Sequence, residues 1–265
     1  MSRPLILITN DDGIYAPGIQ HLWKAMESLA DLVIVAPAAE QSGVGMSISI
    51  RQPLHIDKVE WHESKVEAWA VKGTPVDCVK IALSSILKKS PDLILSGINR
   101  GNNAGRNIIY SGTVAAVMEG THRNIPGIAL SLDEEISPRF DLVSPFVPKL
   151  VDFVLTHKLP LGTFLNVNFP KNSPEGIQGV RFTRQGKEYW KENLEERTHP
   201  SEGKSYYWLG RQLAQFEEDE DSDICWLRKG FATAVPIHVG ELTHHAHLSR
   251  HQALFHDYMD PSFRK

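Results

Sequence analysis

Two adjacent carboxylates stand at the end of the first apolar segment of the chain. Residues 4–13 read Pro-Leu-Ile-Leu-Ile-Thr-Asn-Asp-Asp-Gly, so an aliphatic run leads into Asp11 and Asp12. Neighbouring negative charges repel each other unless a cation or a strong set of hydrogen-bond donors neutralises them. Oxygen ligands favour a hard divalent ion such as Mg²⁺ or Mn²⁺ over zinc. We therefore expect a metal-dependent enzyme that acts on an anionic substrate, with a phosphate as the first candidate.

Two later loops carry further oxygen ligands. Ser42 lies in the loop after an apolar run that ends at Pro37, and Asn99 lies in a glycine- and asparagine-rich loop after a run that ends at Leu95. The loops at the carboxyl ends of parallel strands emerge on one edge of the sheet, so we expect these three loops to converge. Water and a substrate phosphate would complete an octahedral shell around the ion. Two carboxylates, a serine hydroxyl and an asparagine amide oxygen from these loops make a plausible set of ligands for a hard ion.

A candidate phosphate site precedes the helix that is expected to start near Val114. The residues before it supply backbone N–H groups and hydroxyls at a helix N-terminus, which favours an anion. The alternative is that Ser111 or Thr113 caps the helix. The predicted phosphate- or substrate-binding residues, taken from this segment and from the three loops, are Asn10, Gly43, Asn103, Ser111, Gly112 and Thr113.

Strand and helix patterns alternate along the first half of the chain, and these elements must position the loops. Such alternation is typical of βαβ units, and it predicts an α/β fold with a mostly parallel sheet. Met46–Ile50 also alternates and predicts a further short strand. The main predicted strands are Leu5–Thr9, Leu32–Ala36, Val66–Val71, Asp92–Leu95, Ile128–Leu132 and Phe164–Val167, and the predicted helices are Gly18–Leu29, a helix from Pro75, Thr113–Thr121 and Leu142–His157.

Residues 185–223 are polar and aromatic, and we expect them to form a protruding β-hairpin arm. A loop of this length without its own structure is unusual in a compact domain unless it is functional. Trp190 and Trp208 are expected to pack in a contact between subunits, with stacking against a base as the alternative. The segment 217–223, in which six of seven residues are acidic, is expected to be a solvated loop, with metal binding as the alternative.

We interpret the whole chain, 1–265, as a single domain with three parts. These are a catalytic core at 1–183, the arm or flap at 184–230, and a C-terminal oligomerisation tail at 231–265. Several histidines crowd the tail, and on a helix His247 and His251 would share a face. A surface or subunit-contact role is expected for them, and incidental binding of nickel or zinc is the alternative.

Composition excludes several other classes of protein. The 265 residues carry a formal net charge of −4 and the sequence pI is about 6.3, so a dominant nucleic-acid-binding surface is not expected. Cys78 and Cys225 are too few for a disulfide framework or a four-cysteine zinc site, and we expect reduced thiols. Neither a signal-peptide pattern nor a long apolar window is visible, so we expect a cytoplasmic protein without a membrane partner.

Four groups of motifs follow one another over about residues 5–131. They are Thr9–Gly13 with Ala16-Pro17-Gly18, Ala36-Pro37 with Ser42-Gly43, Gly73-Thr74-Pro75 with Asp77-Cys78-Val79, and Ser96-Gly97-Ile98-Asn99 through Asn103 to Tyr110–Ala115. In this order they resemble the SurE family, the stationary-phase survival proteins that act as 5'- and 3'-nucleotidases. The last group is the most specific. The C-terminal half of the chain matches the family less well.

The resemblance carries expectations of its own. It implies a Rossmann-like three-layer sandwich and one divalent ion, Mg²⁺ or Mn²⁺, in each subunit, held by residues that match Asp11, Asp12, Ser42 and Asn99. It also implies homodimers or homotetramers that dephosphorylate nucleoside monophosphates. Some members of the family act on short-chain polyphosphate as well.

For the chemistry we expect Asp11, Asp12 and Asn99 to be the catalytic residues, with an ion that binds a water molecule and a phosphate oxygen together. Direct attack by an aspartate, with an aspartyl-phosphate intermediate, is one alternative. Phosphatases of the haloacid dehalogenase type need an Asp-x-Asp pair for it, and here the residue two before Asp12 is Asn10. A second alternative is a regulator that binds nucleotide or metal without turnover. The glycine motifs of dinucleotide-binding enzymes and of phosphate-loop NTPases are not found at the expected places.

Overall fold

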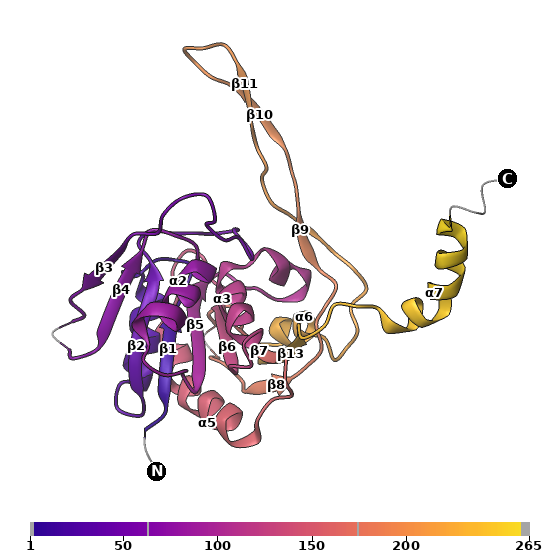
Figure 1. Cartoon of the computed structure of the whole chain (residues 1–265). Helices are drawn as coiled ribbons and strands as arrows, with labels where there is room; N and C mark the ends of the chain where they lie inside the picture. Colours follow the sequence, from indigo (N-terminus) through magenta and orange to yellow (C-terminus); the bar gives the residue numbers. More distant parts are fainter. Residues whose placement is uncertain (1–2, 63, 174, 261–265) are drawn as a thin grey trace.

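Within residues 3–62, 64–173 and 175–260, which the computed structural model describes, a nine-stranded sheet organises the chain (Figure 1). Neighbouring strands run parallel, except that two pairs, β3 with β4 and β13 with β7, are antiparallel. The predicted α/β class with a mostly parallel sheet is confirmed. In sheet order the strands are β3 (Ile56–Val59), β4 (Glu67–Val71), β2 (Asp31–Pro37), β1 (Leu5–Thr9), β5 (Leu93–Arg100), β6 (Gly127–Leu132), β7 (Thr163–Phe169), β13 (Ala232–His238) and β8 (Val180–Phe182).

Helices cover both faces of the sheet and complete a three-layer sandwich. Successive side chains of β1 point to opposite faces, so that Ile6 and Ile8 belong to one apolar cluster and Leu7 to the other. Because both faces are buried, the strands read as continuous aliphatic runs rather than as alternating ones. The first cluster packs against α1 (Pro17–Met26), α4 (Phe140–Val143) and α5 (Val147–His157), and the second packs against α2 (Pro75–Ile81) and α3 (Gly112–Thr121).

The helix predicted at Leu142–His157 is interrupted in the structure. A 3₁₀ turn at Ser144–Phe146 separates α4 from α5. Pro145 and Pro148 lie at the first or second positions of the turn and of α5. Because proline lacks a backbone N–H and fixes its own φ, it is tolerated at a helix start but not in a helix interior.

The strand predicted at Met46–Ile50 is wrong, because the start of α2 uses the polar groups of this segment. Thr74 and Asp77 form a capping box, in which Thr74 Oγ1 accepts from the Asp77 N–H at 3.1 Å and Asp77 Oδ2 accepts from the Thr74 N–H at 2.9 Å. The Ser49 N–H donates to the other Asp77 oxygen at 3.0 Å, and the Thr74 hydroxyl donates to the Ser47 carbonyl at 2.7 Å. The segment therefore runs over the cap of α2 as a loop.

Strand β1 lies between β2 and β5, and it pairs parallel with both. The chain leaves β1 toward one side of the sheet and later returns to its other side with β5. Such a reversal is the topological switch point, where open α/β sheets bind ligands outside the carboxyl ends of their strands. The loops that follow β1, β2 and β5 therefore start from three neighbouring strand ends.

The predicted arm protrudes from the sheet as a long hairpin (Figure 1). Two separate antiparallel ladders build it, β9 (Tyr189–Lys191) with β12 (Gln212–Ala214) near the core and β10 (Glu195–Thr198) with β11 (Ser205–Trp208) toward the tip. A short helix, α6 (Asp223–Arg228), follows the arm. Strand β13, which the sequence-based division places in the tail, lies inside the main sheet and pairs with β7 and β8.

The last helix, α7 (His245–Met259), stands away from the core (Figure 1). None of its residues is buried, and Leu254, Phe255 and Tyr258 are largely exposed. His247 and His251 stack on one face of this helix with their ring centroids 4.3 Å apart. No helix within the described part of the chain combines the length and the apolar character that a membrane span requires.

Candidate active site

Asp11 lies just beyond the end of β1, and it is only 5% exposed. One of its carboxylate oxygens accepts a hydrogen bond from the hydroxyl of Thr113, in the first turn of α3. Burial raises the pKa of Asp11, and the hydrogen bond from Thr113 opposes that rise. The structure thus holds Asp11 rigidly, in an environment that disfavours its negative charge.

Asp12 is partly buried beside Asp11, whose negative charge acts on it directly. Burial and the negative charge of Asp11 raise the pKa of Asp12 to about 7. The backbone N–H of Arg100 points at Asp12 Oδ2 from 3.4 Å and offsets only part of this effect. Two carboxylates that the protein alone does not neutralise fit a divalent cation, which would remove their repulsion.

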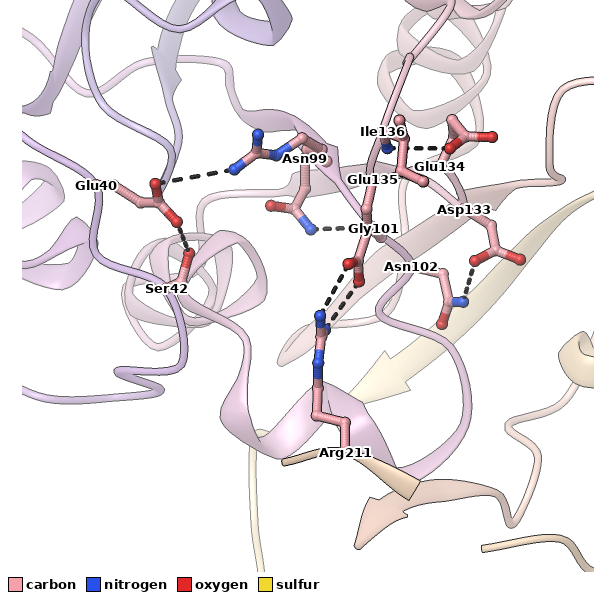
Figure 2. A network of polar contacts seen from close by, with 11 residues as sticks. Glu40, Ser42, Asn99, Gly101, Asn102, Asp133, Glu134, Glu135, Ile136 and Arg211 are labelled. Carbon is pink, nitrogen blue, oxygen red and sulfur yellow. Dashed lines mark hydrogen bonds and ion pairs between the residues drawn. The ribbon is translucent and has the colours of Figure 1, made fainter. Parts of the chain in front are cut away.

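Ser42 extends from the loop after β2, and its hydroxyl donates to Glu40 Oε1 at 2.6 Å. Figure 2 shows Glu40 beside Ser42. The other carboxylate oxygen of Glu40, Oε2, lies 3.9 Å from Arg100 Nη2. Glu40 also adds negative charge that raises the pKa of both aspartates. The sequence analysis did not single out Glu40, although it lies two residues before Ser42 in the same loop.

Asn99 lies near the end of β5, where the strand is irregular. The register with β6 shifts between Ser96 and Asn99, and such bulges re-aim side chains near active sites. The Asn99 amide nitrogen donates to the Gly101 carbonyl at 2.8 Å, which leaves the amide oxygen turned away from Gly101 (Figure 2). An amide oxygen fixed in this way suits a hard cation.

Close packing of α1 supports the irregular end of β5. A Cβ atom on Gly18, in the first turn of α1, would lie 1.9 Å from the Ile98 carbonyl oxygen, so only glycine fits there. Gly97 has a φ of +128°, and a Cβ atom on it would lie 2.3 Å from the Leu130 carbonyl oxygen. The motif glycines therefore allow the backbone approach that places Asn99 at the sheet edge.

Several of the predicted residues line one cavity of about 290 Å³ at this edge. Asn103 is held at the wall of the cavity, because its backbone N–H donates to Asn168 Oδ1 at 2.7 Å and its amide nitrogen donates to Ser131 Oγ at 2.8 Å. Ser111 caps α3 through the Val114 N–H and also faces the cavity. The predicted site residues that line it are Asp11, Ser42, Gly43, Asn99, Asn103 and Ser111.

The remaining predicted site residues do not line that cavity. The Asn10 side chain is occupied in a turn, where its amide nitrogen donates to the Gly13 carbonyl at 2.8 Å and its amide oxygen accepts from the Gly13 N–H at 3.2 Å. Thr113 is fully buried and bonds to Asp11. Gly112 packs so closely on Asp11 that a Cβ atom would lie 2.7 Å from the Asp11 Cβ. Asp12 does not line the cavity either, although it follows Asp11, which does.

A polar network continues from the Asn99 loop toward the arm (Figure 2). Asn102 donates to Asp133 at 2.6 Å, and Arg211, directly before β12, forms two hydrogen bonds of 2.8 Å with Glu135. The sequence analysis missed Asp133, Glu135 and Arg211. For Asp133 and Glu135 the sequence offered one signal, the acidic run Asp133–Glu135 directly after β6, at the same edge of the sheet as the metal-site loops.

The acidic run at 217–223 is not solvated throughout, contrary to expectation. Glu218 Oε1 accepts from the N–H groups of Lys187 and Glu188 at 2.7 and 2.8 Å. Asp223 is fully buried and accepts from the N–H of Gly105 at 3.0 Å and of Gly186 at 2.7 Å. These carboxylates fasten the base of the arm to the loop that follows Asn103.

The described residues contain no group of three or more histidine, cysteine, aspartate or glutamate side chains that could hold a metal ion. The histidines of α7 therefore form no such cluster with one another or with acidic neighbours. The candidate site at the sheet edge has another character, because it pairs two carboxylates with hydroxyl and amide oxygens. Cys78 and Cys225 are both free thiols.

Comparisons with known proteins agree with this geometry. The family model of the survival protein SurE matches residues 6–192. A protein of Protochlamydia amoebophila named 5'-nucleotidase SurE is 56% identical over 98% of this chain and 99% of its own length. A protein of the same name from Flavobacterium psychrophilum is 42% identical over 93% of this chain and 96% of its own length. The crystal structure of a SurE protein from Aquifex aeolicus superposes with a TM-score of 0.81 at 37% identity, over 95% of this chain and all of that one.

Proposed function

The chain belongs to the SurE family, and we propose that it is a metal-dependent 5'-nucleotidase that hydrolyses nucleoside monophosphates to nucleoside and phosphate. One structural observation carries the proposal: Asp11, Ser42 and Asn99, from loops far apart in the sequence, line a single cavity at the carboxyl edge of the sheet. We extend the proposal to 3'-monophosphates and to one Mg²⁺ or Mn²⁺ ion per subunit. The oxygen-only donor set supports a hard ion of this kind.

The residues that would hold the ion are Asp11, Asp12, Ser42 and Asn99. When bound, the ion would lower the pKa of a water molecule and offset negative charge on the phosphate. Thr113 orients Asp11 by its hydrogen bond, and a partner of this kind keeps a ligand in its productive orientation. The fixed amide of Asn99 does the same at the end of β5. These contacts keep the carboxylate and amide oxygens in place before substrate arrives.

The phosphate would lie between the ligand loops and the N-terminus of α3. This helix has ten residues, and its first N–H groups carry the positive end of the helix dipole. Ser111 at its N-cap and Asn103 on the opposite loop both line the cavity. These groups bind and orient the anion, and they exclude part of the water around it.

Direct attack by an aspartate is not favoured. The residue that would complete an Asp-x-Asp pair is Asn10, whose side chain is fully engaged with the backbone of Gly13. We therefore propose attack by water. Hydrolysis of a phosphorothioate analogue of AMP, made chiral at phosphorus with oxygen isotopes, should invert the configuration at phosphorus, because water displaces the nucleoside in a single step. Retention of configuration, which requires two displacements through an aspartyl-phosphate on Asp11 or Asp12, would contradict this route.

The function is tested by phosphate release from AMP and GMP with Mg²⁺ or Mn²⁺, with and without a chelator. We expect release that the chelator abolishes and that added Mn²⁺ restores. A folded, metal-loaded protein that releases no phosphate from any nucleotide would support the regulator instead. Tripolyphosphate in the same assay tests whether this chain also accepts short polyphosphate.

We also propose that the chain forms a homodimer or homotetramer through the arm and α7. The outer hairpin exposes Tyr207, Trp208 and Leu209, and an isolated two-stranded hairpin is marginally stable without further packing. The apolar side chains of helix α7 are likewise not covered by the core of the same chain. Light scattering coupled to size exclusion would give the oligomeric state. The cytoplasmic location stays a prediction.

A further inference from the structure

A second, larger cavity adjoins the candidate metal site. It has a volume of about 730 Å³ and lies between the loop after β6 and the base of the arm. This volume falls in the range of about 300–1,000 Å³ that is usual for small-molecule sites. The two cavities share part of their walls, so a ligand can reach from one into the other. The shared residues are Asn102, Asn107, Asp133, Glu135, Trp190 and Arg211.

Trp190 of β9 forms an aromatic wall at the junction of the two cavities. Its backbone N–H donates to Asn107 Oδ1 at 2.8 Å, which ties β9 to the segment before α3. The Trp190 side chain is 39% exposed, so part of its ring remains available to a ligand. The guanidinium of Arg211 lies over the ring at 5.7 Å from its centroid, and the two bonds to Glu135 hold that guanidinium in place.

The charge of the larger cavity suits an uncharged ligand. Its walls carry four carboxylates and three cationic side chains, a formal sum of −1. Two of the cations are held in ion pairs, Arg211 with Glu135 and Arg228 with the buried Glu188. A second phosphate group would meet net negative charge there. Neutral donors, such as sugar hydroxyls and amino groups on a base, would find carboxylate acceptors. The charged residues are Asp133, Glu134, Glu135, Glu188, Lys171, Arg211 and Arg228.

We propose that this cavity is the nucleoside subsite, in which the substrate base stacks on Trp190 while the ester phosphate occupies the smaller cavity. The inference rests on the proposed function and adds the element that selects a nucleotide over other phosphate monoesters. Stacking on an aromatic side chain is tolerant of sequence, because every base has a π-face. The subsite therefore favours nucleotides as a class over base-free esters.

Trp208 provides the contrast within the same arm. It is also exposed, at 60%, but it belongs to β11 near the tip and lines neither cavity. Trp208 is thus available for a subunit contact, whereas Trp190 faces the space beside the metal site. The two tryptophans, which the sequence analysis grouped together, have separate roles.

The test compares AMP with ribose 5-phosphate, which keeps the ester and the sugar but lacks the base. The kcat/KM ratio of AMP to ribose 5-phosphate is measured with saturating Mn²⁺ for the wild type, Trp190→Leu and Trp190→Phe, with Trp208→Leu as the matched control. Because base stacking is the contact removed, we expect Trp190→Leu to lower the ratio about tenfold. Trp190→Phe should restore most of the ratio, and Trp208→Leu should keep it.

A binding measurement separates this inference from the proposed function. Adenosine titrated calorimetrically into the metal-free protein should bind the wild type and Trp190→Phe, and bind Trp190→Leu about tenfold more weakly. If adenosine binding depends on Trp190 in this way but the wild type releases no phosphate from AMP, the nucleotidase proposal fails and the subsite stands. A ratio and an adenosine affinity for Trp190→Leu within twofold of the wild type would overturn the subsite. A loss in Trp208→Leu as large as in Trp190→Leu would overturn it too.

Discussion

The metal-site edge and the arm hold their functional side chains in opposite ways. At the edge, Asp11 and Asn103 are 5% and 8% exposed; Thr113 of α3 donates a hydrogen bond to Asp11, and Asn103 donates to residues of β6 and β7. On the arm, Trp190 is 39% exposed and the Arg211 side chain 59%, and a few contacts at its base hold both. Among the groups proposed for chemistry, Asp11 is thus fixed in the core while Ser42 is exposed on its loop, and the groups proposed for recognition lie on an added segment. Damage to the edge should abolish turnover, whereas damage to the arm should change the choice of substrate.

The largest effect is expected from Asp12→Asn. The amide cannot supply a carboxylate to the ion, so phosphate release from AMP should fall at least about a hundredfold. The same change removes a buried charge that repels Asp11, so the metal-free protein should unfold at a higher temperature than the wild type. Thermal unfolding without Mn²⁺ checks the expected rise in Tm of the metal-free variant. Thermal unfolding with Mn²⁺ checks metal binding, because a ligand stabilises only the state that binds it.

The comparison for Asp12→Asn is the shift in Tm that Mn²⁺ produces. The wild type should gain stability on adding Mn²⁺, and the variant should gain little. A variant that keeps both the wild-type shift and the wild-type activity would show that Asp12 is not a metal ligand. Damage to the metal-site edge would then not abolish turnover, and the proposed difference from the arm would be lost.

A tenfold effect is expected from Thr113→Val, which removes the hydrogen bond to Asp11 and keeps the shape of the side chain. Loss of such a supporting contact typically costs 10- to 100-fold in metal affinity or activity. We expect the Kd for Mn²⁺ to rise about tenfold while KM for AMP at saturating metal changes little. Thr121→Val in the same helix is the matched control, because its hydroxyl donates to the Val117 carbonyl within the helix. A rise in KM for AMP with unchanged affinity for Mn²⁺ would instead indicate that Thr113 contacts the substrate phosphate.

The contrast between the two regions also explains what the sequence could predict. Each predicted metal ligand lies in a loop after an aliphatic run, so a local pattern was enough to find the three loops, and the resemblance to the SurE family selected the ligands within them. The parallel sheet then brings these ligands together by a general rule. The mostly parallel α/β sheet was predictable for the same reason, because strands buried on both faces leave continuous apolar runs, whereas the three-layer sandwich was expected from the family resemblance.

Long-range contacts set the limit of that prediction. Glu135 and Arg211 are 76 residues apart and meet only because the arm folds back to the core. The segment Met46–Ile50 has an alternating pattern, but Asp77 and Thr74 bind its backbone from another element. The strand predicted at Asp92–Leu95 ended at Leu95, whereas β5 continues to Arg100 because Gly18 and Gly97 allow close backbone approach. The glycines were visible in the sequence, but their contacts were not.

The smallest effect is expected from Glu135→Gln, which weakens the ion pair between the arm and the core. Both side chains are about half exposed, so the pair should contribute less than about 1 kcal/mol to the free energy of unfolding. We expect KM for AMP to rise two- to threefold, because the guanidinium over Trp190 loses its charged partner and the wall of the cavity becomes less ordered.

Glu195→Gln is the matched control for Glu135→Gln. Glu195 forms a similarly exposed pair with Arg197, but on the outer hairpin rather than beside the cavity. If both variants leave KM for AMP unchanged, the arm contributes to recognition only through Trp190. If both raise KM equally, the pair at the cavity has no special position, and the arm affects the site only through its overall stability. A rise confined to Glu135→Gln ties substrate recognition to the contact that joins the arm to the metal-site edge.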